Sequence, residues 1–335
     1  MLRAMKAVVA TRYGGPEVLA IVERPTPEVG PTDVLITVRA AGLNPLDFKL
    51  RDGKAKLALP LKAPIALGCD VAGVVAAIGA QVTKFTVGDE VYARLEKLRM
   101  GGLAEQVAAG EHVVAHKPVS ASFEQAASIP LAGLTSLQAL RESAQTTPGQ
   151  RVLIHAGAGG VGSLAIQIAK ILGLHVTTTT STKNIELVRS LGADAVIDYT
   201  VEALDRKPHD FDAVFDTLGP ASELASIRAT KRGGVVVGVG GLPDAAFAKE
   251  WMPAFTRPAL WLLTGKRRRA AAKAGVRFVY LFMHPDGAQL TEIAGWIDAA
   301  KLKPLIHRTY PFAEVTEAFA ELERGHARGK IVITI

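Results

Sequence analysis

The chain of 335 residues contains a single cysteine, Cys69. One thiol excludes an internal disulfide and any zinc site built from several cysteines. No apolar run reaches the about 18 residues that a membrane-spanning helix needs. The first residues also lack the apolar core of a secretory signal, because Thr11 and Arg12 interrupt the opening apolar stretch. These absences predict a cytoplasmic protein with no stable membrane insertion.

The charge of the chain is only mildly positive, since 39 Lys and Arg against 32 Asp and Glu leave +7. The dense basic run is Lys266-Arg267-Arg268-Arg269, followed by Lys273 and Arg277. A nucleic-acid binder would interleave such a stripe with aromatic residues, so no nucleic-acid partner is expected. The run is interpreted as a solvated helix face or loop. The alternative is a docking patch for anionic lipid, nucleic acid or an acidic partner.

Length and composition predict two folded domains. With 49% apolar and 21% charged residues, the chain is a globular protein longer than the about 250–300 residues at which one core stops growing. Residues 1–121 contain short runs of β-forming residues broken by Gly and Pro, which predicts a small β-barrel or sandwich. The expected strands are Lys6–Ala10, Val34–Ala40, Val71–Ile78, Glu90–Ala93, Gly102–Ala108 and Val113–His116.

Residues 122–285 follow a different pattern, in which short β-rich runs alternate with stretches of helical periodicity. This alternation predicts the α/β class, with a doubly wound parallel sheet. Residues 286–335 then contain two helices and a closing strand, Ile331–Ile335, which is expected to return to the first domain. The expected strands of the α/β domain are Val152–Ile154, His175–Thr178, Ala195–Ile197, Ala213–Phe215, Gly234–Gly238 and Phe278–Met283.

A glycine-rich loop follows the first strand of the α/β domain and precedes an amphipathic helix. It has the G-x-G-x-x-G pattern of dinucleotide sites and reads Gly157-Ala158-Gly159-Gly160-Val161-Gly162. Gly157 permits the tight turn, Gly159 lets the backbone approach a pyrophosphate, and Gly162 lets helix and strand pack closely. The helix N-terminus offers N–H groups to the phosphates. The loop, with Gly160 and Val161, predicts a nicotinamide dinucleotide site.

The end of the second strand indicates which dinucleotide binds. NAD sites usually carry Asp or Glu about 20 residues after the glycines. Here the strand runs into Thr179-Thr180-Ser181-Thr182-Lys183, and no acid occurs before Glu186. Hydroxyl groups and a lysine suit a 2′-phosphate, which an acid would repel. Thr180, Ser181 and Lys183 therefore predict NADPH; the alternative is that Lys183 is only an exposed residue at a helix start.

Further motifs occur in a fixed order along nearly the whole chain. They are Tyr13-Gly14-Gly15-Pro16-Glu17-Val18-Leu19, Ala41-Gly42-Leu43-Asn44-Pro45-Leu46-Asp47, Gly68-Cys69-Asp70-Val71-Ala72-Gly73-Val74-Val75, Val87-Gly88-Asp89-Glu90-Val91 and Gly102-Leu103-Ala104-Glu105. With the glycine loop, they make the chain resemble the medium-chain dehydrogenase/reductase superfamily, in its zinc-free quinone oxidoreductase branch, which includes alkenal and enone reductases. The resemblance implies a GroES-like β-barrel catalytic domain, resumed at the C-terminus, and a Rossmann domain.

The resemblance also shows which metal ligands are missing. Zinc-dependent members have a Cys where Leu43-Asn44 stand, a His where Cys69 stands and a further Cys near Ala132. They also carry four clustered cysteines for a structural zinc. Cys69 and Asp70 cannot complete a zinc tetrahedron on their own. No metal is expected, and the chemistry is expected to run without one.

The resemblance implies roles for individual residues. Asn44 matches an asparagine beside the nicotinamide and the substrate, and Thr135 matches a threonine that lies against the cofactor. The positions that hold the 2′-phosphate in relatives are matched by Ser181, Lys183 and Tyr199, with Arg324 and Arg328 as alternative sources of a C-terminal arginine. The residues expected to flank the nicotinamide are Leu218, Val239 and Gly240.

Three residues near Asn44 are candidates for the substrate side of the site. Asp47 is a candidate to orient Asn44 or a substrate carbonyl, although Pro45 before it also fits a capping role at a helix start. Phe48 and Cys69 are expected to line the substrate pocket. Cys69 would act there as a small hydrophobe, with a redox-sensitive thiol as the alternative.

Together these features predict a zinc-independent NADPH-dependent oxidoreductase. It would reduce quinones, or the activated C=C bond of α,β-unsaturated carbonyls, by hydride transfer. The alternatives are an enoyl-thioester reductase, or a nucleotide-binding protein with a mainly binding or structural role. The apolar sixth strand, Val276–Met283, is expected at one end of the sheet, where pairing with its twin across a two-fold axis would give a homodimer.

Overall fold

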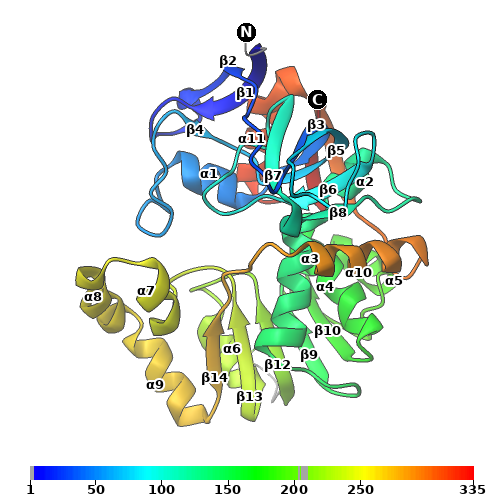
Figure 1. The fold of residues 1–335 in the computed structure, drawn as a ribbon. Helices are drawn as coiled ribbons and strands as arrows, with labels where there is room; N and C mark the ends of the chain where they lie inside the picture. Colours follow the sequence, from blue (N-terminus) through cyan, green and yellow to red (C-terminus); the bar gives the residue numbers. More distant parts are fainter. Residues whose placement is uncertain (1–3, 203, 205–209) are drawn as a thin grey trace. The chain divides into compact units, whose positions relative to one another are not determined.

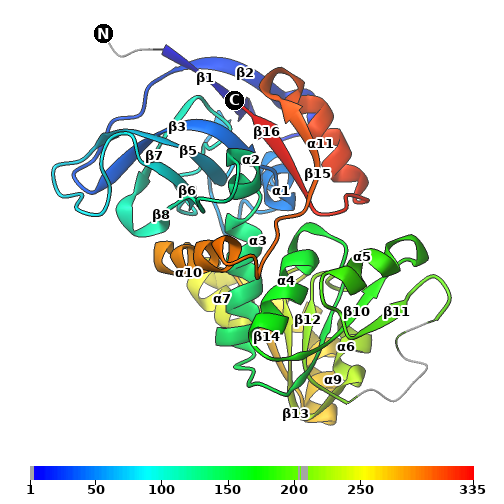
Figure 2. The ribbon, with the colours of Figure 1, turned by 90° about the vertical axis from the view of Figure 1, so that its right-hand side faces the viewer.

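The computed structural model describes residues 4–202, 204 and 210–335. In that part of the chain no helix is both long and apolar enough to cross a membrane. The chain divides into two compact units, each with its own sheets and core (Figure 1, Figure 2).

The first unit comprises Met1–Leu134 and His284–Ile335, and the second comprises Thr135–Met283. The expected boundaries were after residues 121 and 285. Helix α2 and the start of α3 therefore lie with the β-rich unit. The helices of the first unit are α1 (Pro45–Arg51), α2 (Phe123–Ala127), the first part of α3 (Pro130–Leu137), α10 (Gly287–Asp298) and α11 (Val315–Arg324).

The first unit is built on two sheets, one of three strands and one of seven. The orders are β2-β1-β4 and β15-β16-β3-β5-β6-β8, with β7 paired to β3 beside this path. Valine, isoleucine and alanine side chains from β3, β5, β6 and β7 form much of the core of the larger sheet. The strands are β1 (Ala4–Ala10), β2 (Leu19–Pro25), β3 (Asp33–Gly42), β4 (Ile65–Ala66), β5 (Asp70–Ile78), β6 (Glu90–Arg94), β7 (Gln106–Gly110), β8 (Val114–His116), β15 (Ile306–Pro311) and β16 (Lys330–Thr334).

One edge of β3 is shared by two partners. β7 pairs with its first half, Asp33–Thr37, and β16 pairs with its end, Ala40–Gly42. The closing strand of the chain thus returns to the first unit, as the sequence predicts. This pairing brings the first residues of β16 next to the start of α1 (Figure 2).

Three strands of this unit, β2, β4 and β15, lie outside the predicted set. β2 has a short apolar start, residues 19–22, but it ends in Glu23-Arg24-Pro25 and none of its residues is fully buried. β4 is only two residues long. Their positions depend on pairing with β1 and β16, which a local pattern does not report.

The second unit contains a six-stranded parallel sheet with the order β11-β10-β9-β12-β13-β14. This is the doubly wound order of dinucleotide-binding folds, with the reversal between β9 and β12. The predicted strands are all present, within a few residues of the predicted ends. The strands are β9 (Arg151–Ile154), β10 (His175–Thr180), β11 (Ala195–Asp198), β12 (Phe211–Asp216), β13 (Thr230–Gly238) and β14 (Arg277–Tyr280).

Helices cover this sheet on both faces. Right-handed crossovers that run in opposite directions from the reversal place their helices on opposite sides. α4 and α5 pack against β9, β10 and β11, whereas α6 and α9 pack against β12, β13 and β14 (Figure 2). The helices are α4 (Gly160–Ile171), α5 (Ile185–Ser190), α6 (Glu223–Ala229), α7 (Ala245–Trp251), α8 (Arg257–Leu263) and α9 (Gly265–Ala274).

Candidate functional site

Asn44 stands directly before α1 and is buried. Pro45 at the first helical position favours a helix start there, because an N–H at that position would have no intrahelical acceptor. The Asp47 carboxylate accepts the backbone N–H of Asn44 at 2.8 Å and that of Gly68 at 3.0 Å. Burial raises the pKa of Asp47 to about 6, against these hydrogen bonds, which lower it. Asp47 thus holds the backbone of Asn44 in place from a fully buried position.

A glycine turn before β5 delivers Cys69 next to Asn44. Gly68 has φ of +91°, and a Cβ there would lie 2.5 Å from the backbone nitrogen of Leu103, so only glycine fits. The Cys69 Sγ lies 3.5 Å from the side-chain nitrogen of Asn44. Burial, with the nearby Asp70 carboxylate, raises the pKa of the Cys69 thiol well above its usual value. The thiol is therefore protonated at neutral pH and has low nucleophilicity.

Asp70 is the buried acid of this site. Its Oδ2 accepts the Asn44 side-chain N–H at 2.9 Å, and its Oδ1 accepts the Leu131 backbone N–H at 2.9 Å. Burial raises the pKa of Asp70, while the charge of Lys330 and the hydrogen bond from Asn44 act to lower it. The second N–H of Asn44 has longer contacts, 3.3 Å to the Gly42 oxygen and 3.5 Å to the Cys69 sulfur.

Lys330 completes the site from the other end of the chain. It is the first residue of β16, and its buried ammonium donates to the Leu43 oxygen at 2.8 Å and to Asn44 Oδ1. It lies 3.6 Å from Asp70 Oδ2. The sequence analysis missed this residue, because one lysine between a glycine and an apolar strand is usually a solvated strand end. Only the pairing of β16 with β3 turns it inward. We call Asn44, Cys69, Asp70 and Lys330 the polar cluster.

The polar cluster does not suit a metal ion. The described residues contain no group of three His, Cys, Asp or Glu that could hold one. The ammonium of Lys330, 3.6 Å from Asp70, also puts a positive charge where a metal cation would have to bind. The absence of zinc stays a prediction that this donor set supports.

The glycine loop of the second unit joins β9 to α4, as predicted. A Cβ on Gly157 would lie 2.2 Å from Thr178 Oγ1, and one on Gly162 would lie 2.2 Å from the Ala156 oxygen. Gly159 is the residue before α4, and Gly160 and Val161 begin the helix, half-exposed. The first N–H groups of a helix have no intrahelical acceptor. The loop therefore fits the diphosphate of a dinucleotide.

The residues predicted for the 2′-phosphate lie together at the carboxyl edge of the sheet. Thr180 ends β10 and Tyr199 follows β11, which is its parallel neighbour. The Tyr199 N–H donates to the Thr180 oxygen at 3.1 Å, which ties the two strand ends together. Ser181 is half-buried, and Lys183 and Tyr199 are exposed. Two hydroxyls, an ammonium and a phenol thus surround one edge, which suits an anionic phosphate.

An acid that the sequence analysis did not consider also lies at this edge. Asp198 ends β11, opposite Thr180. It accepts Thr182 Oγ1 at 2.5 Å and the Thr200 N–H and Oγ1 at 2.9 and 2.7 Å. These bonds lower the pKa of Asp198 and occupy both of its oxygens. Lys183 forms no ion pair with an acid among the described residues, so its positive charge is available for a phosphate.

The predicted nicotinamide residues follow the next two strands along the sheet. Leu218 comes after β12, and Val239 and Gly240 come after β13. Leu218 N–H donates to Asp216 Oδ1 at 3.0 Å, and Val239 N–H donates to the Asp216 oxygen at 3.2 Å. β12 adjoins β9, and β13 is the next strand along the sheet. The strand order reverses between β9 and β12, which is where α/β sheets bind ligands.

The remaining predicted residues lie on both units. Thr135 is buried in α3 at the start of the second unit, and Phe48 is half-buried in α1. Arg324 pairs with Glu321 at 2.9 Å. Arg328 lies exposed before β16, and its guanidinium forms no ion pair with a described residue. Of the two arginines, Arg328 is the one whose charge is free for a phosphate.

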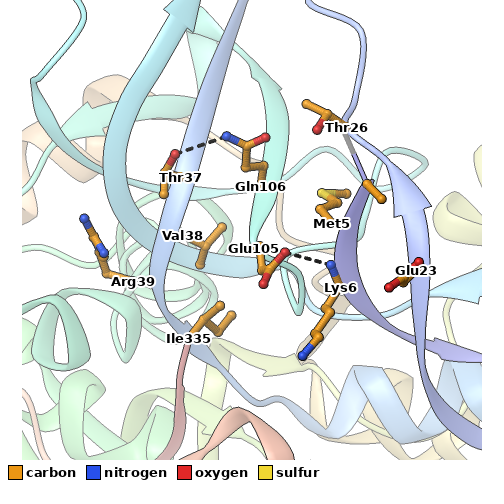
Figure 3. Close-up of a pocket in the computed structure, with 11 residues that line it drawn as sticks. Met5, Lys6, Glu23, Thr26, Thr37, Val38, Arg39, Glu105, Gln106 and Ile335 are labelled. Atoms are coloured by element: carbon orange, nitrogen blue, oxygen red, sulfur yellow. Dashed lines mark hydrogen bonds between the residues drawn. The ribbon is translucent and has the colours of Figure 1, made fainter. Parts of the chain in front are cut away.

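A groove of about 580 Å³ lies elsewhere in the first unit, between the β1–β2 pair and the β3–β7 pair (Figure 3). It is open, and Lys6, Arg39 and Glu105 line it together with Ile335. The Lys6 backbone N–H donates to Glu105 there at 2.8 Å. None of the predicted site residues lines this groove.

Lys330→Met tests the polar cluster. Removing the ammonium leaves a buried carboxylate and a buried amide oxygen, so we expect the free energy of unfolding to fall by about 2–4 kcal/mol. Without the ammonium the pKa of Asp70 rises further. A buried acid whose pKa is raised in the folded state destabilises the protein as pH rises, because ionising the acid costs more there than in the unfolded chain. The loss in the free energy of unfolding should therefore be larger at neutral pH than at acidic pH. Urea unfolding at both pH values measures it.

Two variants control this measurement. Lys301→Met removes an exposed lysine and should leave stability nearly unchanged. Asp70→Asn combined with Lys330→Met should recover part of the loss, since the buried negative charge is gone. A Lys330→Met protein as stable as the parent at neutral pH would show that the cluster is not held by this ammonium.

Known protein families match both units. Residues 30–138 match the alcohol dehydrogenase GroES-like domain family, and residues 191–333 match the zinc-binding dehydrogenase family. The chain is 36% identical to the mitochondrial NAD(P)H oxidoreductase RTN4IP1 of Mus musculus, over 99% of this chain and 89% of that protein. It is 38% identical to the chloroplastic NADPH-dependent alkenal/one oxidoreductase of Arabidopsis thaliana, over 99% and 80%.

A solved structure gives the same result. The quinone oxidoreductase from Coxiella burnetii superposes with a TM-score of 0.84 at 36% identity, over 99% of this chain and all of that one. This similarity extends across the GroES-like and the Rossmann parts alike. The chain therefore belongs to the medium-chain dehydrogenase/reductase superfamily, in its quinone oxidoreductase branch.

Proposed function

We propose that this protein is an NADPH-dependent oxidoreductase that reduces quinones or the activated C=C bond of α,β-unsaturated carbonyls. Two observations together carry the proposal. The carboxyl edge of the parallel sheet offers hydroxyl groups and the unpaired ammonium of Lys183, which suit a phosphate. The buried amide of Asn44 has an N–H with only long contacts, of 3.3 and 3.5 Å. The relatives named for alkenal/one and quinone reduction match over nearly the full chain. Bound NADPH would supply the hydride.

The chain's own residues would hold the cofactor by its phosphates. The first N–H groups of α4, beyond Gly157 and Gly159, would bind the diphosphate. Ser181, Lys183 and Tyr199 would hold the 2′-phosphate, with Arg328 from the first unit as a further cation. Thr135, Leu218, Val239 and Gly240 would contact the nicotinamide side.

Asn44 is proposed as the donor to the substrate oxygen. One of its N–H groups is engaged by Asp70 at 2.9 Å, whereas the other has only contacts of 3.3 and 3.5 Å to give up. The ammonium of Lys330 on Asn44 Oδ1 polarises the amide and strengthens the remaining N–H as a donor. When hydride reaches the β-carbon of an enone, negative charge develops on the carbonyl oxygen, and a preorganised donor there lowers the barrier. Phe48 and Cys69 would contact the apolar part of the substrate.

The position of a label tests the reaction. With NADPH deuterated at C4 and an enone substrate, we expect deuterium on the β-carbon of the product and an intact carbonyl group. The reason is that a conjugated carbonyl accepts hydride without a Lewis acid, whereas carbonyl reduction would rely on one. Mass spectrometry and NMR of the product locate the label. Deuterium on the carbonyl carbon of an alcohol would make the protein a carbonyl reductase, and no turnover of enones, quinones or enoyl thioesters would favour a binding role.

Asn44→Ala tests the oxyanion donor. We expect kcat to fall about 10²–10³-fold, as for other lost oxyanion donors. NADPH affinity should change less, because the phosphates bind elsewhere. Stopped-flow rates and fluorescence titration with NADPH separate the two quantities, and Asn44→Asp keeps the shape as a matched variant without the N–H donor. An unchanged kcat in Asn44→Ala would remove the residue from the mechanism.

The choice of NADPH over NADH can be reversed by design. We expect the parent protein to bind NADPH more tightly, and Ser181→Asp with Lys183→Ala to prefer NADH. Each lost charge-assisted hydrogen bond costs about 1.5–3 kcal/mol. Calorimetry with both cofactors measures the ratio of the two affinities, and Arg189→Ala, which removes an exposed cation from the last turn of α5, serves as a charge control. Equal affinities in the parent would contradict the assignment.

We also propose that the protein forms a homodimer through β14. This strand ends the parallel sheet and pairs only with β13 among the described strands, which leaves its outer edge without a strand partner. An antiparallel pairing with its twin would give that edge a partner. We expect light scattering at micromolar concentration to give twice the chain mass. A monomeric parent would contradict the proposal.

The cytoplasm is the location we propose. The single cysteine is buried and needs no oxidising compartment. Fractionation of cells that express the tagged chain tests it, and recovery with an organelle would contradict it.

A further inference from the structure

The second unit carries an exposed apolar segment that its core does not use. Four large side chains of α8 and the turn before it are mostly exposed: Phe255 by 79%, Trp261 by 58%, Leu262 by 74% and Leu263 by 67%. α8 is held mainly through Leu260, which is buried. Single exposed apolar side chains are ordinary, but a contiguous group of this size marks an interaction site.

The helix that follows, α9, carries the basic run. One of its basic residues is buried and the others are exposed. Arg267 is buried, pairs with Glu223 at 3.1 Å and lies over the Phe278 ring at 4.1 Å. It is the residue that attaches α9 to the unit. The exposed basic residues of α9 are Lys266, Arg268, Arg269 and Lys273, and none of them forms an ion pair with an acid in the described part of the chain.

The apolar and basic groups meet where α8 and α9 are joined, at Trp261 and Arg268. The Arg268 guanidinium lies 4.1 Å from the centre of the Trp261 ring and donates to the Trp261 oxygen at 3.0 Å. In Figure 1, α7, α8 and α9 follow one another beyond β14, the last strand of the sheet. We call Phe255, Trp261, Leu262 and Leu263, with the four exposed basic residues of α9, the α8–α9 surface.

The charge of this region is of one sign. Between positions 251 and 285 the sequence has seven Lys and Arg residues and no Asp or Glu, in a chain whose whole net charge is +7. The support beneath it is firm, because α7 is held by edge-to-face contacts of Phe247 with Tyr280 at 5.2 Å and of Trp251 with Phe282 at 5.1 Å. The surface is therefore a fixed basic and apolar face that lacks an acidic partner of its own.

We propose that the α8–α9 surface binds peripherally to membranes that contain anionic lipids. Helices that bind at the membrane interface combine Trp, Phe and Leu with Lys and Arg. Their apolar side chains insert between lipid headgroups, and their cations contact the lipid phosphates. A second copy of this chain fits less well, because a two-fold interface would place the basic residues of α9 against each other. Nucleic acid fits less well, because the Arg268 guanidinium already lies over the Trp261 ring, and Leu262 and Leu263 offer no ring for a base to stack on. The inference is independent of the proposed reaction.

Vesicle sedimentation of the full chain tests the proposal. The parent protein should sediment with vesicles of phosphatidylcholine and phosphatidylserine, less with phosphatidylcholine alone, and less as salt is raised. The Lys266→Gln, Arg269→Gln, Lys273→Gln variant should bind on the order of 100-fold more weakly. Leu262→Ser with Leu263→Ser should bind about tenfold more weakly. Fluorescence of Trp261, kept in both variants, should shift to the blue and be quenched by brominated lipid in the parent.

Matched controls use side chains of the same kind elsewhere. Lys84→Gln, Arg189→Gln, Lys301→Gln removes three exposed charges, and Leu98→Ser with Val119→Ser removes two exposed apolar side chains. Both should sediment like the parent, and all variants should keep the parent's thermal unfolding and NADPH affinity.

Several outcomes would overturn the proposal. One is a parent protein that stays in solution with both kinds of vesicle at low salt, and another is an equal loss of binding in the control variants. Conversion of a parent dimer into a monomer by Leu262→Ser with Leu263→Ser would show that a second copy covers the surface. RNA binding that this variant retains, without vesicle binding by the parent, would assign the surface to nucleic acid.

Discussion

The polar cluster of the first unit depends on the buried ammonium of Lys330. Asp70 and Asn44 present oxygens in a region without solvent, where an unpaired carboxylate costs several kcal/mol. The ammonium that compensates them comes from 286 residues further along the chain than Asn44. The polar cluster therefore exists only when β16 has paired with β3. The C-terminal return of the chain is a requirement of the site as well as a feature of the fold.

Two acids of the second unit, Asp198 and Asp216, are satisfied without a cation, and this leaves Lys183 without an acidic partner among the described residues. Asp216 is buried and accepts from Ser222, Ser226 and two backbone N–H groups, and Asp198 accepts from Thr182 and Thr200. Neutral donors satisfy both carboxylates, so neither needs a lysine or arginine. Lys183 thus keeps its charge at the sheet edge, where a phosphate would need it.

The basic run shows how one stretch of like charges serves two purposes. Arg267 is committed to Glu223 and the Phe278 ring inside the unit, and the other basic residues of α9 face outward beside the exposed side chains of α8. A surface of this composition would bring the protein to a lipid layer, where quinones and other apolar carbonyl compounds concentrate. Substrate supply would then depend on a face of the protein that takes no part in the chemistry.

Local patterns in the sequence were enough for the alternating strands and helices of the parallel α/β unit, the glycine loop and the hydroxyl-rich end of β10, because consecutive strands and short loops carry their own signals. The residue at the end of β11, Tyr199, was predicted only through the family resemblance. Tertiary structure alone decided the rest. β2 and β4 form because β1 is beside them, Asp198 joins the phosphate edge because β11 pairs with β10, and Lys330 turns inward because β16 closes on β3. In each of these strand pairings the partner residue lies tens to hundreds of residues away in the sequence. The local periodicity of the sequence therefore cannot predict which side chains meet.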